Sequence, residues 1–151
     1  MRKVLFMKGS ELRLIEYMEG SKKRFIIPVY QRNYDWKIEN CKQLYDDLIQ
    51  VIKNNSKTHF FGSIVSVYEP SGRNTEFLII DGQQRLTTMS LLFLAMYNLL
   101  EEKIIISEDE SLKDQIYEDF LVDKYQPQEK RMKLKPIKND QKAFSKLFNS
   151  K

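Results

Sequence analysis

The sequence contains few of the residues that build disulfide frameworks and metal centres. Among its 151 residues there is one cysteine, Cys41, and one histidine, His59. A single cysteine excludes an internal disulfide bond, and one cysteine with one histidine cannot complete a zinc site of the usual four-ligand kind. We therefore expect Cys41 to be a packing residue. His59 could reach a ligand site or could be an ordinary surface or packing residue.

The sequence also lacks long apolar segments. Its longest one, residues 86–100, is interrupted by polar side chains and is shorter than the roughly 20 residues that a membrane-spanning helix needs. The basic and apolar residues 1–7 are followed by Lys8 and Glu11, which end the run before it reaches the length of a secretory signal. The sequence therefore predicts a cytoplasmic protein with no membrane partner.

Charge of one sign is not strongly in excess. The formal net charge is +4, which permits contact with nucleic acid but does not require it. A hydrophobic fraction of 42% is enough for a packed core in a chain of this length. We expect one globular domain, together with the start of a further region.

The most informative pattern lies in residues 77–88, which read Phe-Leu-Ile-Ile-Asp-Gly-Gln-Gln-Arg-Leu-Thr-Thr. An apolar run stops at polar residues and a helical pattern follows, so we expect a strand, a sharp turn at Gly82 and a helix. The backbone amides of Gln83, Gln84 and Arg85 lack partners in the first helical turn. These amides, the helix dipole and the Arg85 guanidinium together suit a phosphate group.

Asp81 precedes this turn, and two roles for it stay open. Its carboxylate could cap the helix, in which case the whole turn could be purely structural. Alternatively, a carboxylate beside a phosphate could hold a cation.

A second polar stretch stands among aromatic residues. Residues 27–36 read Ile-Pro-Val-Tyr-Gln-Arg-Asn-Tyr-Asp-Trp, in which Gln31 and Arg32 lie between Tyr30 and Tyr34. An aromatic face can stack on a base while Gln31 and Arg32 bind phosphate or sugar. The same rings, with Trp36, could instead pack on the sheet.

These two stretches, with His-Phe-Phe-Gly-Ser-Ile at residues 59–64 between them, resemble a known family. The three blocks are similar to the N-terminal domain of GmrSD-type, modification-dependent restriction proteins, over about residues 8–100. That family looks like the ParB and sulfiredoxin superfamily, in which a strand-turn-helix corner holds nucleotide phosphates. The resemblance implies a nucleotide-binding and nucleoside triphosphate-hydrolysing domain that controls the cleavage of modified DNA in restriction or phage defence.

The resemblance also implies which residues form the site and which cofactors it needs. We expect a nucleoside triphosphate and Mg²⁺, with Asp81 as the metal ligand and with catalytic roles for Asp81, Gln84 and Arg85. The expected nucleotide-binding residues are Tyr30, Gln31, Arg32, Tyr34, Gly82, Gln83, Gln84, Arg85 and Thr87.

The remaining patterns predict an α+β fold of the ParB/sulfiredoxin-like kind, a small mixed sheet with a central hairpin packed by helices. Residues 24–27 are expected to form a strand, residues 59–68 and 75–80 the hairpin, and residues 39–53 an amphipathic helix. The second hairpin strand is apolar on both faces, which favours a central position covered by helices. Residues 84–102 are apolar almost all round and should form the buried core helix.

The last third of the chain has a different composition. Residues 108–123 are expected to form an acidic surface helix. A basic stretch follows, expected to be an edge strand with exposed Lys133, Lys135 and Lys138, and then a helix capped by Asn139. We accordingly divide the chain into a nucleotide-binding domain, residues 1–125, and residues 126–151, the possible start of a truncated C-terminal region.

In one respect the chain departs from the family that it resembles. Members often continue into a nuclease module with an His-Asn-His-like site, whereas this chain ends at Lys151 with His59 as its one histidine. We therefore expect the nuclease to be a separate subunit or a missing C-terminal domain, with modified DNA as a possible partner. The alternative is a ParB-like module that binds DNA or a partner protein without catalysis. Sulfiredoxin-type thiol chemistry is disfavoured because the turn holds no cysteine.

Overall fold

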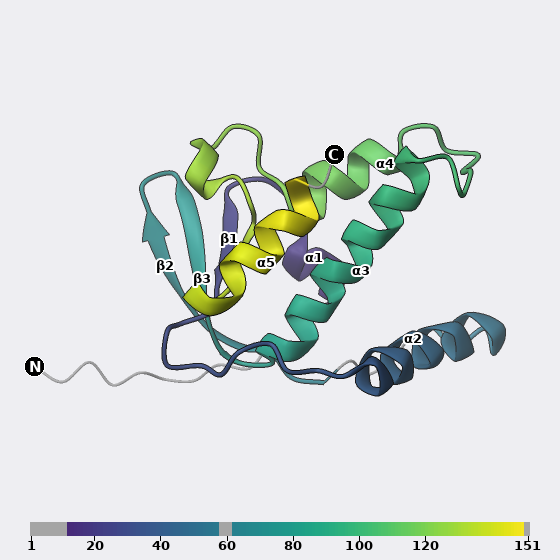
Figure 1. Ribbon diagram of the computed structural model, residues 1–151, viewed down its shortest axis with the longest axis horizontal. Coiled ribbons are helices and arrows are strands. Elements are labelled where there is room, and N and C mark those ends of the chain that lie inside the picture. The colour runs from purple at the N-terminus through teal and green to yellow at the C-terminus, as the bar shows by residue number, and fades with distance from the viewer. Residues whose placement is uncertain (1–11, 58–61, 150–151) are drawn as a thin grey trace, which may run out of the picture.

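The computed structural model describes residues 12–57 and 62–149. Within these ranges the chain has a mixed α+β architecture with one four-stranded sheet and five α-helices, which confirms the predicted class (Figure 1). The elements, in chain order, are α1 (Leu14–Met18), β1 (Lys23–Ile26), α2 (Ile38–Lys53), β2 (Val65–Ser71), β3 (Asn74–Asp81), α3 (Gln83–Glu101), α4 (Leu112–Ile116), β4 (Leu134–Lys135) and α5 (Lys138–Asn149).

The strands lie in the order β2-β3-β1-β4. β2 and β3 form an antiparallel hairpin, while β1 runs parallel to both β3 and β4. β3 is interior and β4 is an edge strand, as predicted. The hairpin as a whole is not central, because β1 pairs with β3 but not with β2, which is left at the other edge of the sheet. The first hairpin strand begins at Val65, so residues 62–64 of the predicted strand are not part of it, and residues 59–61 lie outside the described residues.

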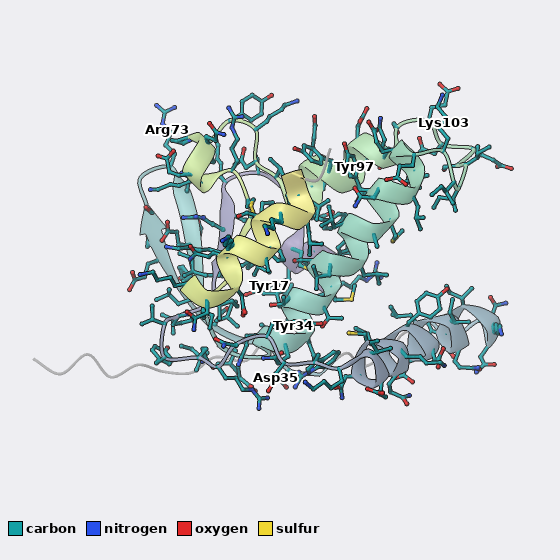
Figure 2. All side chains as sticks on the ribbon, viewed as in Figure 1. Tyr17, Tyr34, Asp35, Arg73, Tyr97 and Lys103 are labelled. Atoms are coloured by element: carbon teal, nitrogen blue, oxygen red, sulfur yellow. The ribbon has the colours of Figure 1, made fainter. Side chains whose placement is uncertain are left out.

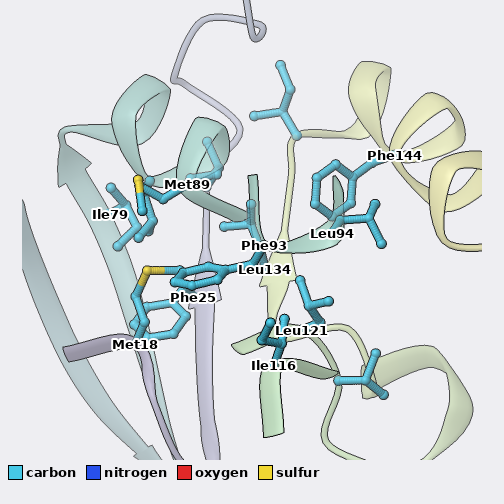
Figure 3. Packing of buried hydrophobic residues seen from close by; sticks show 14 of the residues in the cluster. Met18, Phe25, Ile79, Met89, Phe93, Leu94, Ile116, Leu121, Leu134 and Phe144 are labelled. Carbon is cyan, nitrogen blue, oxygen red and sulfur yellow. The ribbon is translucent and has the colours of Figure 1, made fainter. Parts of the chain in front are cut away.

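One face of the sheet carries the core. Phe25 of β1 and Phe77 of β3 are register partners, with ring centroids 5.4 Å apart. Phe25 and Ile79 are fully buried in a cluster that also contains residues of α1, α3 and α5 (Figure 3). Each such side chain stabilises the fold by about 1.5–3 kcal/mol through burial. The opposite face of β3 is less covered, and Ile80 is 39% exposed. The prediction that helices cover both faces was therefore wrong, because a short apolar run does not reveal which side is packed.

α3 is the long helix of this core, and its predicted burial is confirmed by Leu86, Met89, Phe93 and Leu94. None of the helices in the described ranges has the length and apolar character to span a membrane.

The predicted amphipathic helix of residues 108–123 is shorter than expected and packs its apolar side into the core. α4 continues into one turn of π-helix at Tyr117–Leu121. Ile116 and Leu121 are buried in the core, and the Phe120 ring stacks on Phe93 of α3 at 4.2 Å. Acidic residues on one side of a helix do not prevent its apolar side from packing inward.

The basic stretch also differs from its prediction. Lys133 is 1% exposed rather than solvated, and its ammonium group donates to the carbonyl oxygens of Met18 and Gly20, each at 2.6 Å, and to that of Asp119. These three carbonyls supply partners for a charge that would otherwise not be buried. α5 begins at Lys138, so Asn139 lies inside the helix and does not cap it.

Candidate functional site

The three sequence blocks meet where β3 ends and α3 begins. The connection from β1 to α2 runs beneath the N-terminal end of α3 (Figure 1). Within it, Gln31 donates its side-chain amide to the carbonyl of Ile80, at 2.8 Å. From the first turn of α3, Arg85 donates through Nη1 to the carbonyl of Ser63, in the segment before β2, at 2.7 Å. Segments far apart in the chain are therefore joined by side-chain to backbone hydrogen bonds at one corner.

Two glycines make this close approach possible. Gly82 lies immediately before α3 with φ +89°, and a Cβ there would come 2.9 Å from the Ser63 carbonyl oxygen. Gly62 has φ +101°, and its Cβ would come 2.3 Å from Nη1 of Arg85. Side chains other than glycine are strained at such φ angles. A Cβ at Gly82 would also meet backbone, while a Cβ at Gly62 would require the Arg85 guanidinium to move. The Gly-Ser and Asp-Gly-Gln-Gln-Arg blocks thus need their glycines to pack against each other.

Gln84 fixes the position of the polar segment beneath α3. Its buried carboxamide accepts from the backbone amide of Asp35 at 3.1 Å and donates to the carbonyl of Asn33 at 3.0 Å. Figure 2 shows Asp35 and Tyr34 at the N-terminal end of α3. A side chain with both ends engaged in this way holds the segment in one conformation.

Tyr34 is held equally firmly. Its hydroxyl lies 2.9 Å from Thr88 Oγ1 and 3.3 Å from the sulfur of Cys41, and its backbone amide donates to Asp140 of α5 at 2.8 Å. Burial raises the pKa of Tyr34 to about 12, with the hydrogen bond to Cys41 adding to the shift. Tyr34 therefore stays a neutral phenol at physiological pH. Cys41, expected to be a packing residue, is half-buried in this cluster.

A cavity of about 320 Å³ opens beside this corner, between the segment after β1, α3 and α5. This volume lies at the lower end of the range for small-molecule sites. Its polar lining comes from Arg32, Gln83, Gln84, Thr87 and Asp140. The rest of its lining is Ile27, Tyr34, Leu91, Pro136, Ile137, Ala143, Phe144 and Leu147.

The structure brings some of the predicted site residues together in this cavity and places others outside it. Arg32 and Tyr34 of the first block share the lining with three α3 residues of the third, Gln83, Gln84 and Thr87. Tyr30 is 70% exposed and, like Gln31, Asp81, Gly82 and Arg85, is not part of the lining. The two blocks therefore share a cavity, while the Arg85 guanidinium lies at the Ser63 side of the helix end.

Asp81 is exposed and makes no hydrogen bond to cap α3; the residue at the cap position is Gly82. Of its two possible roles, the structure therefore rules out the cap. No group of three or more His, Cys, Asp or Glu side chains that could hold a metal ion occurs in the described part of the chain. One carboxylate still suits Mg²⁺, which is commonly bound by one or two carboxylates together with substrate phosphates. His59 lies outside the described residues.

Sequence reasoning missed the contribution of α5. Asp140, Phe144 and Leu147 line the cavity, although they follow the Asp-Gly-Gln-Gln-Arg turn by more than fifty residues. The apolar spacing of α5 indicates an inner face but not the element that this face packs against. The two links that bring α5 here, the pairing of β4 with β1 and the Asp140 carboxylate accepting from the Tyr34 amide, have no sequence signature.

The family model of the GmrSD restriction endonuclease N-terminal domain matches residues 14–151. The chain belongs to this family. A search of curated protein sequences finds no match. The GmrSD N-terminal domain match extends well past residue 100 and includes α5, so the helix that walls the cavity is part of the family pattern.

Proposed function

We propose that this GmrSD N-terminal domain binds a nucleoside triphosphate and hydrolyses it as the regulatory part of a modification-dependent, type IV-like restriction or phage-defence system. The observation that carries the proposal is the convergence of the three blocks on the N-terminal end of α3, beside a cavity of ligand size. The family supports the link to a restriction system.

In this proposal the phosphates lie across the end of α3. The amides of Gln83 and Gln84 and the helix dipole face them, since the first amides of a helix have no partner within it. Arg32 approaches from the cavity side and Arg85 from the Ser63 side. The triphosphate is thus held between two guanidinium groups. Both arginines belong to the family blocks.

The hydrolytic step is assigned to the same corner. Asp81 is the exposed carboxylate next to the helix end, where it can bind Mg²⁺ or orient a water molecule. Mg²⁺ bound there would neutralise charge on the phosphates. Gln84 serves catalysis by holding residues 33–35, and Arg85 by stabilising negative charge that develops during phosphoryl transfer.

The finer fold assignment is also a proposal. We infer that the sheet and the β3–α3 corner are of the ParB/sulfiredoxin-like kind, because a strand-turn-helix corner of that superfamily holds phosphates. The nuclease would be supplied by a separate subunit or a C-terminal domain, and modified DNA would be the substrate of that nuclease.

The second candidate is a DNA- or partner-binding module without catalysis. A specific observation favours it: four basic residues outnumber two carboxylates around a small hollow of about 20 Å³ at the N-terminal end of β1. The basic residues are Lys22, Lys23, Arg24 and Lys130, and the carboxylates are Glu76 and Asp123. Within the hollow the Arg24 Nε atom is buried without a partner among the described residues. Basic groups gathered in this way can contact nucleic-acid phosphates.

Calorimetric titration of the purified chain with each nucleoside triphosphate, with and without Mg²⁺, tests the first candidate. Arg85→Ala should weaken binding at least tenfold, whereas Lys138→Ala, at an exposed position on α5, should bind as wild type does. A urea unfolding curve for each variant checks that the fold is retained. A wild-type chain that binds no nucleotide, but binds DNA in a salt-dependent way through Lys22 and Lys130, would favour the second candidate.

A further inference from the structure

Three of the four α3 residues that line the cavity form one stripe along the helix. Gln83, Thr87 and Leu91 are spaced by four residues, which places them on one side of the helix, and all three line the cavity. The stripe changes along its length from a carboxamide through a hydroxyl to an aliphatic group. The polar part therefore lies next to the helix end where the phosphates are proposed to bind.

The two polar members of this stripe belong to largely buried residues and have no side-chain partner among the described residues. Gln83 is 9% and Thr87 is 6% exposed, and neither side chain makes a hydrogen bond within the described part of the chain. Neighbouring polar groups behave differently: Gln84 has two backbone partners, and Thr88 donates to the Gln84 carbonyl at 2.8 Å. Gln83 and Thr87 thus present hydrogen-bonding capacity to whatever occupies the cavity.

The remainder of the lining defines the shape of that occupant. Leu91 of α3 faces an apolar wall that includes Ile137, Phe144 and Leu147. Phosphate groups gain nothing from such a wall, because burying charge against apolar side chains is unfavourable. A flat apolar body with a polar edge suits it, with the edge directed at Gln83 and Thr87.

We propose that the cavity binds the nucleobase of the nucleotide, with Gln83 and Thr87 as its specificity-determining residues. The inference rests on the proposed nucleotide-binding function. The Gln83 carboxamide offers a donor and an acceptor side by side, which matches the hydrogen-bonding edge of a base, while the ring lies against Leu91 and Phe144. The base in the cavity and the phosphates across the end of α3 are then adjacent, as they must be in one nucleotide.

The proposal makes α5 a functional wall of the site. Asp140 already connects α5 to the Tyr34 amide, and its carboxylate lies on the cavity lining, where it can accept from a base amino group. Residues 137–147 therefore contact the ligand directly, although they lie far from the motif that binds the phosphates.

The test compares nucleoside triphosphates with inorganic tripolyphosphate by calorimetry. Ala143→Trp fills the cavity from α5, where Ala143 lines it yet is exposed enough to accept a larger side chain. Gln83→Leu removes the base-reading carboxamide at similar volume. Ala95→Trp is the matched control, an exposed alanine of α3 outside the cavity lining. Should Ala143→Trp fail to fold, Ala143→Leu provides the same obstruction in milder form.

Wild type should bind at least one nucleoside triphosphate tenfold or more tightly than tripolyphosphate. Ala143→Trp should lose that advantage and keep wild-type affinity for tripolyphosphate. Gln83→Leu should lose the advantage together with the preference among bases, and Ala95→Trp should match wild type. Nucleotide binding that is unchanged in both cavity variants overturns the base pocket and leaves the phosphate site intact. A wild-type chain that binds tripolyphosphate as tightly as nucleotides also overturns the base pocket and leaves the phosphate site intact. If wild type binds neither ligand, the proposed function fails and this inference with it.

Discussion

Arg85 Nη1 lies 2.7 Å from the carbonyl oxygen of Ser63 and directly against Gly62. This bond fixes a guanidinium group that has five donors in all while using only part of that capacity. The first turn of α3 is thereby joined to the segment that enters β2. A planar cation held in position in this way can meet a phosphate without a large loss of side-chain entropy.

The Gly62–Arg85 contact gives the first prediction. Gly62→Ala should destabilise the protein by about 2 kcal/mol, because Ala is strained at a φ of +101° and because its Cβ would move the guanidinium away from the Ser63 carbonyl. It should also weaken nucleotide binding by displacing Arg85. Urea unfolding and calorimetric titration measure the two effects.

Gly20→Ala is a matched control for this change. Gly20 has a nearly identical φ of +98°, but no atom lies within 4 Å of the position that a Cβ would take there. It should therefore show only the conformational strain, about 1 kcal/mol, with nucleotide affinity unchanged. Equal losses of stability in the two variants would show that the contact with Arg85 costs nothing.

The second prediction separates two neighbouring glutamines. Gln84→Leu should cost about 1–3 kcal/mol of stability, because the Asp35 amide and the Asn33 carbonyl lose their partner. Gln83→Leu, at a similarly buried position with no side-chain hydrogen bond within the described residues, should change the free energy of unfolding by less than about 0.5 kcal/mol. Urea unfolding of both variants makes the comparison. A larger loss in Gln83→Leu than in Gln84→Leu would contradict the assignment of Gln84 as the structural member of the pair.

Much of this corner was predictable from the sequence because its determinants are local. The apolar run that ends at Asp81, the glycine that follows and the helical spacing after it specify strand, turn and helix within a dozen residues. The interior position of β3 and the burial of α3 follow from the same local pattern. The assignment of residues from the first and third blocks to one nucleotide site came from the family resemblance, not from spacing.

What could not be predicted depends on tertiary packing. Lys133 looks like a solvated lysine in a basic stretch, and only the three carbonyls gathered from separate segments explain its burial. In the same way, the position of Arg85 outside the cavity depends on where the Gly62–Ser63 backbone passes. The position of α5 beside the cavity depends on β4, a two-residue strand that pairs with β1. A strand this short has almost no recognisable sequence pattern.

The third prediction concerns Lys133. Burial lowers its pKa to about 8 from an ordinary value of 10.5, with the charge of Lys23 adding to the effect. Between these values the unfolded chain binds more protons than the folded one, so the free energy of unfolding should rise with pH from about pH 8, by at most about 1.4 kcal/mol per pH unit. Urea unfolding at several pH values, kept below the range in which tyrosines ionise, measures this rise.

Lys133→Met is the variant for this prediction. It should be less stable at pH 7 by about 2–4 kcal/mol, because the Met18, Gly20 and Asp119 carbonyls lose a charged donor. Its stability should lack the wild-type rise above about pH 8. Lys135→Met, at an exposed position on β4, serves as the control and should keep the rise. The same pH profile in wild type and in Lys133→Met would mean that another group is responsible.

The last prediction addresses Asp81. Its carboxylate is exposed and caps no amide of α3, so Asp81→Asn should change the free energy of unfolding by less than about 0.5 kcal/mol. If Asp81 holds Mg²⁺ or orients water, the variant should keep most nucleotide affinity measured without Mg²⁺ and lose turnover at least a hundredfold. Glu69→Gln, which removes an exposed carboxylate from β2, should retain wild-type turnover. Phosphate release assays and calorimetry measure both properties, and undiminished turnover in Asp81→Asn would exclude a catalytic role for this carboxylate while leaving nucleotide binding by the corner untouched.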